Sequence, residues 1–241
     1  MNANPSSGRL PLAGRLALVT GAGRGVGHAI AMALATSGAT VCAVSRTGTR
    51  PGFPGRPEIE ILSVDLAVDE EVEGLVETVT ERLGNVSILV HSAGLYLAGR
   101  LDAAAMGDLD LLYRVNFRAP YLLTKLLLPA LRVTAGHVVF INSTTTGRAG
   151  VGQYASTKFA LRAFAETLRD ELNPDGIRVT TVHLGRTATD MQKAVLQAEG
   201  RPFDPTRLIQ PEDVASTVLH AVTLPSTAQV GEVSLLTQQK I

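Results

Sequence analysis

The chain has 241 residues, of which 45% are hydrophobic and 18% are charged, a composition that can bury the core of one large domain. Its 22 Lys and Arg residues balance 22 Asp and Glu residues, so no net charge favours nucleic acid or an anionic membrane as a partner. The single cysteine, Cys42, excludes an internal disulfide, and the lack of a signal-like or membrane-spanning apolar run favours a cytoplasmic protein.

Residues 1–13 are rich in Pro, Ser and Gly and predict a flexible tail, followed by one domain over residues 14–241. In that domain, short aliphatic or β-branched runs alternate with helical stretches. The predicted strands are Leu16–Thr20, Thr40–Ser45, Ile59–Val64, Ser87–His91, His137–Asn142, Arg178–His183 and Val230–Leu236. The predicted helices cover residues 25–37, 69–83, 107–131, 153–173 and 211–223. This alternation predicts a single-domain α/β fold, with a doubly wound, mostly parallel sheet of about seven strands flanked by helices.

The connection between the second and third predicted strands, residues 46–58, is unusual because it contains three prolines and three glycines. This composition excludes a regular helix. Thirteen residues are still enough to cross over the sheet, so we predict an extended loop.

A glycine-rich turn follows the first strand. The sequence Thr-Gly-Ala-Gly-Arg-Gly-Val-Gly occupies residues 20–27, and a predicted helix begins at once. Glycines in such a turn let backbone N–H groups approach a diphosphate, which the positive end of the helix favours. Glycine in a tight turn can also be merely steric, but the position between strand and helix favours a nucleotide site.

Tyr154 and Lys158 lie near the start of the helix that follows the fifth strand. A spacing of four residues places both side chains on one helical face. A tyrosine is a poor acid or base at neutral pH unless a cation stabilises its phenolate, and the Lys158 ammonium can lower the pKa of Tyr154 in this way. The plainer alternative is a half-buried tyrosine beside a solvated lysine.

Ser143 ends the fifth strand, eleven residues before Tyr154. Both residues are expected at the carboxyl edge of the sheet, where doubly wound folds bind ligands. A serine hydroxyl there can hydrogen-bond a substrate oxygen while Tyr154 transfers its proton. Ser143 can also be simply a polar residue at a strand end.

Asn116 lies within the long predicted helix 107–131, four residues before Pro120. Because proline has no N–H, the carbonyl of Asn116 loses its helical partner. A freed carbonyl at that depth needs another donor, and a relay water can supply one. The alternative is a bend that only improves packing.

These motifs cover about residues 14–223 and resemble the short-chain dehydrogenase/reductase family of single-domain Rossmann proteins, whose glycine motif is Thr-Gly-x-x-x-Gly-x-Gly. The resemblance implies a catalytic tetrad of Asn116, Ser143, Tyr154 and Lys158. It implies that Asn116 holds a water linking Lys158 to bulk solvent, and that Lys158 also binds the nicotinamide ribose. The cofactor itself carries the hydride.

The resemblance also implies further cofactor contacts, although the motifs depart from the family in places. Ser92 stands where the family usually has asparagine, and Leu184 replaces a proline before the segment near the nicotinamide. The connection from Ser143 to Tyr154 is two residues shorter than usual, so Thr144 or Thr145 is an alternative for the hydroxyl role. The implied cofactor-binding residues are Gly21, Gly23, Arg24, Gly25, Val26, Gly27, Ser45, Arg46, Asp65, Leu66, Ser92, Ala93, Gly94, Tyr154, Lys158, Gly185, Thr187 and Thr189.

The end of the second strand favours NADP(H) over NAD(H). Many NAD-dependent relatives have an acidic residue there, whereas this chain has Ser45 and Arg46, with no carboxylate before Glu58. Ser45 and Arg46 offer donors and positive charge to a 2′-phosphate, which a carboxylate would repel. Arg24 is expected to reach the same phosphate, and Arg50 is an alternative to Arg46.

The sequence therefore predicts an NADP(H)-dependent oxidoreductase that interconverts a ketone or aldehyde and an alcohol, with Tyr154 as general acid/base. The alternative is a catalytically silent NADP-binding sensor of the same fold. No metal site is expected. Residues 186–208 are expected to form a substrate lid. The expected substrate walls are Leu95, Tyr96, Thr145, Arg148, Val151, Met191 and Val195.

The two helices 107–131 and 153–173 carry more apolar residues than one buried face requires. The excess includes five leucines in the first helix and Phe159, Leu161, Phe164 and Leu168 in the second. The sequence thus predicts a homodimer or homotetramer that assembles through these helices.

Overall fold

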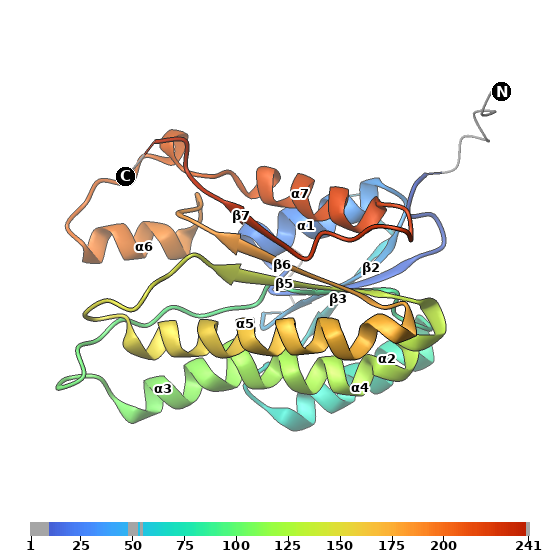
Figure 1. Ribbon diagram of the computed structural model, residues 1–241, viewed down its shortest axis with the longest axis horizontal. Helices are drawn as coiled ribbons and strands as arrows, with labels where there is room; N and C mark the ends of the chain where they lie inside the picture. The colour runs from blue at the N-terminus through green and yellow to red at the C-terminus, as the bar shows by residue number, and fades with distance from the viewer. Residues whose placement is uncertain (1–9, 48–52, 54, 240–241) are drawn as a thin grey trace.

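The computed structural model describes residues 10–47, 53 and 55–239 (Figure 1). Seven strands form one sheet in which all neighbours are parallel, in the order β3-β2-β1-β4-β5-β6-β7. The strands are β1 (Leu16–Thr20), β2 (Thr40–Ser45), β3 (Ile59–Ser63), β4 (Ile88–His91), β5 (His137–Ser143), β6 (Arg178–Leu184) and β7 (Glu232–Leu235). The predicted doubly wound, seven-stranded sheet is confirmed, and each strand matches its predicted range within two residues.

Helices cover both faces of the sheet, as Figure 1 shows. One face packs against α1 (Gly25–Thr36) and α7 (Pro211–Thr223), and the other packs against α2 (Asp69–Arg82), α4 (Ala119–Thr134) and α5 (Gly152–Leu172). Consecutive strand residues enter opposite cores: Val19 joins the first cluster and Leu18 the second, and both are fully buried. Burial on both faces explains why the strands are apolar at consecutive positions.

The single helix predicted over 107–131 is divided into three parts. The chain forms α3 (Met106–Tyr113), a five-residue π-helix η1 (Arg114–Arg118) and then α4. Pro120 is the second residue of α4 and cannot donate to the Asn116 carbonyl. The helix widens there, and the Ala119 N–H donates to the carbonyl of Arg114, five residues earlier. The backbone irregularity expected from Pro120 is therefore a π-helix, and it contains Asn116.

The expected lid, residues 186–208, contains its own secondary structure. Helix α6 (Asp190–Ala198) begins at Thr189, whose side chain accepts a hydrogen bond from the Gln192 N–H, and a short 3₁₀ turn, η3, covers Pro205–Arg207. A parallel bridge between Thr187 and Ile209 joins the two ends of this segment. The segment expected to act as a lid is thus a helix held between two short connections.

The structure also bears on the expected N-terminal tail and on the expected loop over residues 46–58. Leu12, at the end of the expected tail, is fully buried, and its N–H donates to the Ser37 carbonyl. Ordered packing therefore begins before residue 14. The described residues of the 46–58 connection contain no helix, and buried Phe53 stacks on His28 at 4.5 Å. Arg50 lies outside the described residues.

The strand order reverses between β1 and β4: the chain adds β2 and β3 on one side of β1, and then β4 to β7 on the other side. Strands β1 and β4 pair directly, with Thr20 opposite His91. The chain runs outward from this pair in both directions, so the loops after β1 and β4 diverge and leave a crevice at the carboxyl edge. No helix in the described part of the chain combines the length and the apolar character needed to cross a bilayer.

Candidate active site

A cavity of about 860 Å³ occupies this crevice, lined by the segments that follow β1, β2, β4, β5 and β6. Most of the residues proposed from the sequence line it; Gly25 and Asn116 do not. The proposed cofactor and catalytic residues on the lining are Gly21, Gly23, Arg24, Val26, Gly27, Ser45, Arg46, Asp65, Leu66, Ser92, Ala93, Gly94, Ser143, Tyr154, Lys158, Gly185, Thr187 and Thr189.

The glycine loop after β1 leaves no room for side chains. A Cβ atom at Gly21 would lie 2.7 Å from the backbone of Ala93, and one at Gly27 would lie 2.4 Å from the Gly21 carbonyl oxygen. Gly21 and Gly25 also have positive φ values of 67° and 56°, which glycine adopts without strain. The bare backbone loop ends at the N-terminus of α1, an arrangement that suits a diphosphate.

The end of β2 supplies the polar groups expected for the adenosine ribose. The Ser45 hydroxyl is buried and has no hydrogen-bond partner in the described part of the protein, while Arg46 is exposed at the cavity edge. Arg24 forms an exposed ion pair with Asp190 at 3.1 Å. Such an exposed pair is weak, so the guanidinium can exchange partners at little cost.

The loop after β4 is fixed by Thr20. The hydroxyl of this buried residue accepts hydrogen bonds from the N–H groups of Ser92 and Ala93 at 3.1 and 3.2 Å. The Ser92 hydroxyl is a second buried group without a partner among the described residues. At the opposite wall, Asp65 accepts from the Ala67 N–H at 2.9 Å, which shapes the turn beside Leu66.

Asn116 lies behind the cavity and joins two of its walls. Its side chain accepts from the Leu95 N–H at 2.8 Å and donates to the Leu95 carbonyl and to the Thr157 hydroxyl at 3.0 and 3.1 Å. Because Asn116 is fully buried, this pairing satisfies its amide without solvent. The π-helix thereby connects the β4 loop to helix α5, which carries Tyr154 and Lys158.

Lys158 is buried and Tyr154 is partly buried, and their removal from solvent shifts the pKa of both side chains. Burial lowers the pKa of Lys158 to about 8, and its Nζ donates to the Ile141 carbonyl at 3.3 Å. Burial raises the pKa of Tyr154, and a hydrogen bond with Ser143 opposes that rise. The lowering of the Tyr154 pKa by the Lys158 ammonium, expected from the four-residue spacing, is not found in the protein alone.

The hydroxyl groups after β5 differ in their partners. Ser143 hydrogen-bonds Tyr154 and accepts from the Thr145 N–H at 3.1 Å. The Thr144 hydroxyl instead donates to the Leu184 carbonyl at 3.2 Å, and the Thr145 hydroxyl donates to the Thr146 carbonyl at 3.5 Å. Of the three hydroxyls, the Ser143 hydroxyl is the one that pairs with Tyr154.

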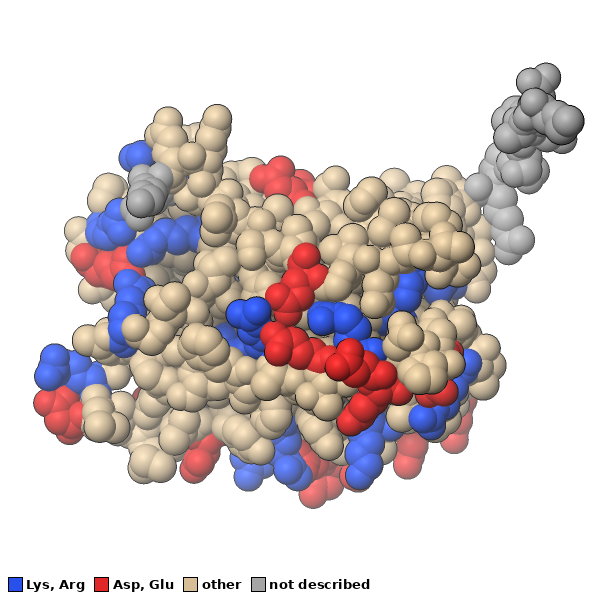
Figure 2. Space-filling view, viewed as in Figure 1, with Lys and Arg blue, Asp and Glu red and all other residues tan. Residues whose placement is uncertain are grey.

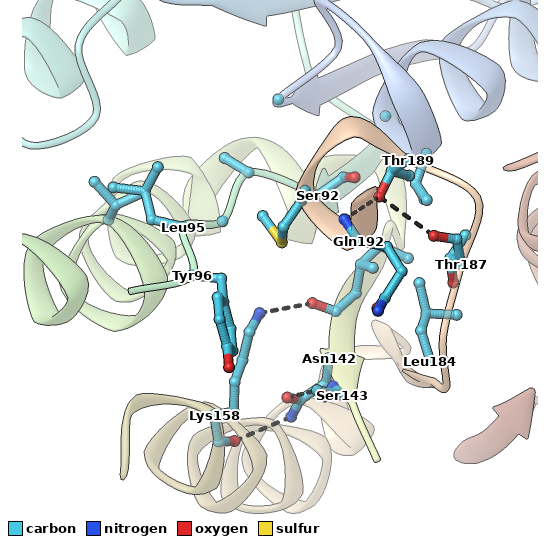
Figure 3. A pocket seen from close by; sticks show the side chains of 18 of the residues that line it. Ser92, Leu95, Tyr96, Asn142, Ser143, Lys158, Leu184, Thr187, Thr189 and Gln192 are labelled. Carbon is cyan, nitrogen blue, oxygen red and sulfur yellow. Dashed lines mark hydrogen bonds between the residues drawn. The ribbon is translucent and has the colours of Figure 1, made fainter. Parts of the chain in front are cut away.

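The far end of the cavity is lined by apolar and polar side chains, some of which belong to the segment after β6. Figure 3 shows Leu95 and Tyr96 on one side and Thr187, Thr189 and Gln192 on the other. The Tyr96 ring meets the Tyr154 ring edge-on at 4.9 Å. The expected substrate walls on the lining are Leu95, Tyr96, Thr145, Arg148, Met191 and Val195, whereas buried Val151 is not part of it.

The sequence reasoning missed several lining residues, two of which are polar side chains of the segment after β6. Arg186 directly follows Gly185, and Gln192 directly follows Met191, so each stands next to a residue that was proposed. The Gln192 side-chain nitrogen is buried without a partner in the described part of the protein. Polar side chains within the segment Gly-Arg-Thr-Ala-Thr-Asp-Met-Gln were the available signal.

Comparison with known proteins agrees with this geometry. The family model for short-chain dehydrogenases matches residues 15–200. The chain is 32% identical over 238 residues to a glycine betaine reductase of Emericella nidulans; the match covers 92% of this chain and 19% of that protein. The chain thus spans about a fifth of the length of this relative.

Two solved structures have the same arrangement over nearly the whole chain. A metagenomic short-chain oxidoreductase in complex with NADP has a TM-score of 0.81 at 27% identity, covering 95% of this chain and 100% of that one. An alcohol dehydrogenase of the archaeon Thermococcus sibiricus, complexed with 5-hydroxy-NADP, has a TM-score of 0.81 at 27% identity, and the match covers 94% of this chain and 98% of that one. With a family model that matches most of its length, this chain is an oxidoreductase that belongs to the short-chain dehydrogenase family.

Proposed function

We propose that the protein is an NADP(H)-dependent oxidoreductase that interconverts a ketone or aldehyde and an alcohol, with Tyr154 as the general acid/base. The observation that carries this proposal is the pairing of Tyr154 with Ser143 on the lining of the same cavity as the glycine loop. A cavity that joins a diphosphate site to a proton donor is what carbonyl reduction by a dinucleotide requires.

The residues that fit the cofactor line the crevice from the glycine loop to the ends of β2 and β4. The glycine loop holds the diphosphate, and the unpartnered hydroxyls of Ser45 and Ser92 supply hydrogen bonds that the protein alone leaves unmade. When bound, the nicotinamide supplies or accepts the hydride. Arg46 binds the 2′-phosphate, in line with the NADP found in the metagenomic relative.

The proton chemistry belongs to the protein. The raised pKa keeps the Tyr154 phenol neutral at pH 7, which is the form that donates a proton to a carbonyl oxygen. The Ser143 hydroxyl donates a hydrogen bond to the same oxygen and stabilises the charge that develops on it. Lys158, protonated below pH about 8, binds the nicotinamide ribose.

Asn116 acts as a positioning residue for this chemistry. Its bonds to Leu95 and Thr157 fix the wall on which Lys158 and Tyr154 stand. We include in the proposal the relay water expected near its freed main-chain carbonyl, through which Lys158 recovers a proton from solvent. Ser143, rather than Thr144 or Thr145, takes the hydroxyl role because it alone of the three pairs with Tyr154.

The alternative function, an NADP-binding sensor without turnover, uses the same cofactor site. A sensor has no need for a proton donor paired with a serine at the end of the cavity. The pairing of Tyr154 with Ser143 therefore favours the enzyme.

We also propose that the protein forms a homodimer or homotetramer through helices α3, α4 and α5. The five leucines of residues 122–128 are at least partly buried within the chain, so they are not the contact surface. We propose instead that a row of aromatic side chains forms the contact surface. The ring centroid of Tyr121 lies 4.7 Å from that of Phe164 and 6.2 Å from that of Phe117, and the Phe117 and Tyr113 centroids are 5.5 Å apart. Tyr113 and Tyr121 are almost half exposed, which is typical of an interface rather than of free surface.

Replacing Tyr154 with Phe tests the chemistry. Tyr154→Phe should bind NADPH as wild type does, yet lose 10²-fold or more in kcat, because general acid catalysis typically contributes about 10²–10⁴-fold. A screen of ketones and aldehydes, followed by nicotinamide absorbance, supplies the substrate. Tyr113→Phe, at an exposed tyrosine, is the matched control. A near wild-type kcat for Tyr154→Phe would refute the role of this residue.

Replacing Arg46 with Asp tests the cofactor. The change removes a charge-assisted contact worth about 1.5–3 kcal/mol and adds repulsion, so the ratio of kcat/KM for NADPH over NADH should fall at least tenfold. Arg24→Ala should have a smaller effect in the same direction, because it removes a positive charge without adding a negative one. A wild-type preference for NADH would contradict the cofactor assignment, and an unchanged preference in Arg46→Asp would contradict the residue.

Replacing Tyr121 with Asp tests the assembly. Sedimentation of the wild type at micromolar concentration should give the mass of a dimer or tetramer, and Tyr121→Asp should shift it toward the monomer by placing a charge in an apolar contact. Leu101→Asp, at a residue that is 98% exposed, is the control and should sediment as wild type does. A purely monomeric wild type would rule the assembly out.

A further inference from the structure

The charges that line the cavity are strongly unbalanced. Among the described residues, the lining carries five cationic side chains and a single carboxylate, that of Asp65. In the proposed function, Arg24 and Arg46 lie at the 2′-phosphate end, and Lys158 serves the ribose and Tyr154. The other two cations, Arg148 and Arg186, have no task toward the cofactor.

Arg148 and Arg186 approach the substrate end from two different loops. Arg148 lies between Ser143 and Tyr154 on the connection from β5 to α5, and Arg186 is the second residue after β6. The rest of this end is largely apolar, with side chains such as Tyr96 and Val195 on the lining. Two guanidinium groups at the edge of an apolar pocket are costly to leave unpaired.

A single carboxylate pairs with both guanidinium groups. Glu199, at the end of α6, lies 2.7 Å from Arg186 Nη2 and 3.1 Å from Arg148 Nη2, and Arg201 Nη1 is 3.9 Å away. Although burial raises it, hydrogen bonds from Arg186 and Arg148 hold the pKa of Glu199 below its ordinary value. One carboxylate against three arginines leaves two positive charges uncompensated here. Figure 2 shows Lys and Arg side chains gathered around acidic ones over the outer end of α6.

The two guanidinium groups also keep unused donors. Each donates to Glu199 through Nη2 alone. Their other N–H groups have no hydrogen-bond partner within residues 10–47, 53 and 55–239. A planar guanidinium can bind a carboxylate by donating two parallel hydrogen bonds. Each of these two groups can therefore bind a second carboxylate through its unused N–H donors.

We infer that the substrate is an oxo acid, whose carboxylate binds Arg148 and Arg186 while its carbonyl meets Tyr154 and its apolar part contacts the Tyr96 side of the pocket. The inference rests on the proposed function and narrows its substrate class. The Glu199 carboxylate, which contacts both arginines, shows that one carboxylate can reach Arg148 and Arg186 together. The Arg148 side chain is 53% exposed and its contact is the longer of the two, so Arg148 exchanges Glu199 for the substrate more readily than Arg186 does.

Matched substrate pairs test the inference. Unbranched oxo acids and their methyl esters, with the carbonyl at successive positions, are compared by kcat/KM with NADPH. The wild type should prefer the acid by roughly ten- to a hundred-fold, the range for a charge-assisted pair. In Arg148→Gln and Arg186→Gln this ratio should fall at least tenfold. Arg201→Gln removes a nearby positive charge that is not on the cavity lining and should keep the ratio.

Calorimetry on the complex with NADP⁺ gives a readout independent of turnover, with the acid and the ester as ligands of the wild type and of the three variants. Equal use and equal binding of acid and ester by the wild type would overturn the inference while leaving carbonyl reduction intact. A preference for the acid that persists in both Arg148→Gln and Arg186→Gln would overturn it as well. Failure to reduce any carbonyl compound would count against the proposed function, and the calorimetric preference would still decide whether anions bind.

Discussion

The close approach of the glycine loop to the loop after β4 is the contact on which the rest of the site depends. Gly21 has no room for a Cβ because the Ala93 backbone occupies that space, and Thr20 holds the same loop through its hydroxyl. This contact places two diverging loops edge to edge at the reversal point of a parallel sheet. The dinucleotide crevice and the position of Leu95, and through Leu95 that of Asn116, follow from it.

Burial of polar groups is the second constraint on the site. Lys158 and Asn116 lie in the interior, where an unpaired polar group costs roughly 1–3 kcal/mol. The Asn116 amide is satisfied by protein, whereas Lys158 makes one contact of 3.3 Å and has a lowered pKa. A cofactor ribose that binds Lys158 therefore relieves a cost already present in the folded protein, which favours binding.

The sequence predicted the fold well because its signals are local. Apolar runs placed every strand, and the glycine turn and the Tyr154–Lys158 spacing placed the residues of one cavity. Pro120 predicted an irregularity near Asn116, although a freed carbonyl alone does not distinguish a bend from the π-helix. The sequence predicted a lowered pKa for Tyr154, whereas the pKa is raised. The rise comes from burial, which the spacing of residues along the chain does not show. The ion pair of Arg148 with Glu199 was missed because it depends on where helix α6 packs against the rest of the chain.

We propose that hydride passes between the nicotinamide and a carbonyl carbon in this cavity, with the proton supplied by the protein. Reduction of a carbonyl substrate with NADPH deuterated at the transferring C4 position tests it most directly, with mass spectrometry of the alcohol product. The expected product carries one deuterium, located at the carbinol carbon. Tight binding of the deuterated NADPH without deuterium in any product across a broad panel of carbonyl compounds would contradict it and favour a sensor.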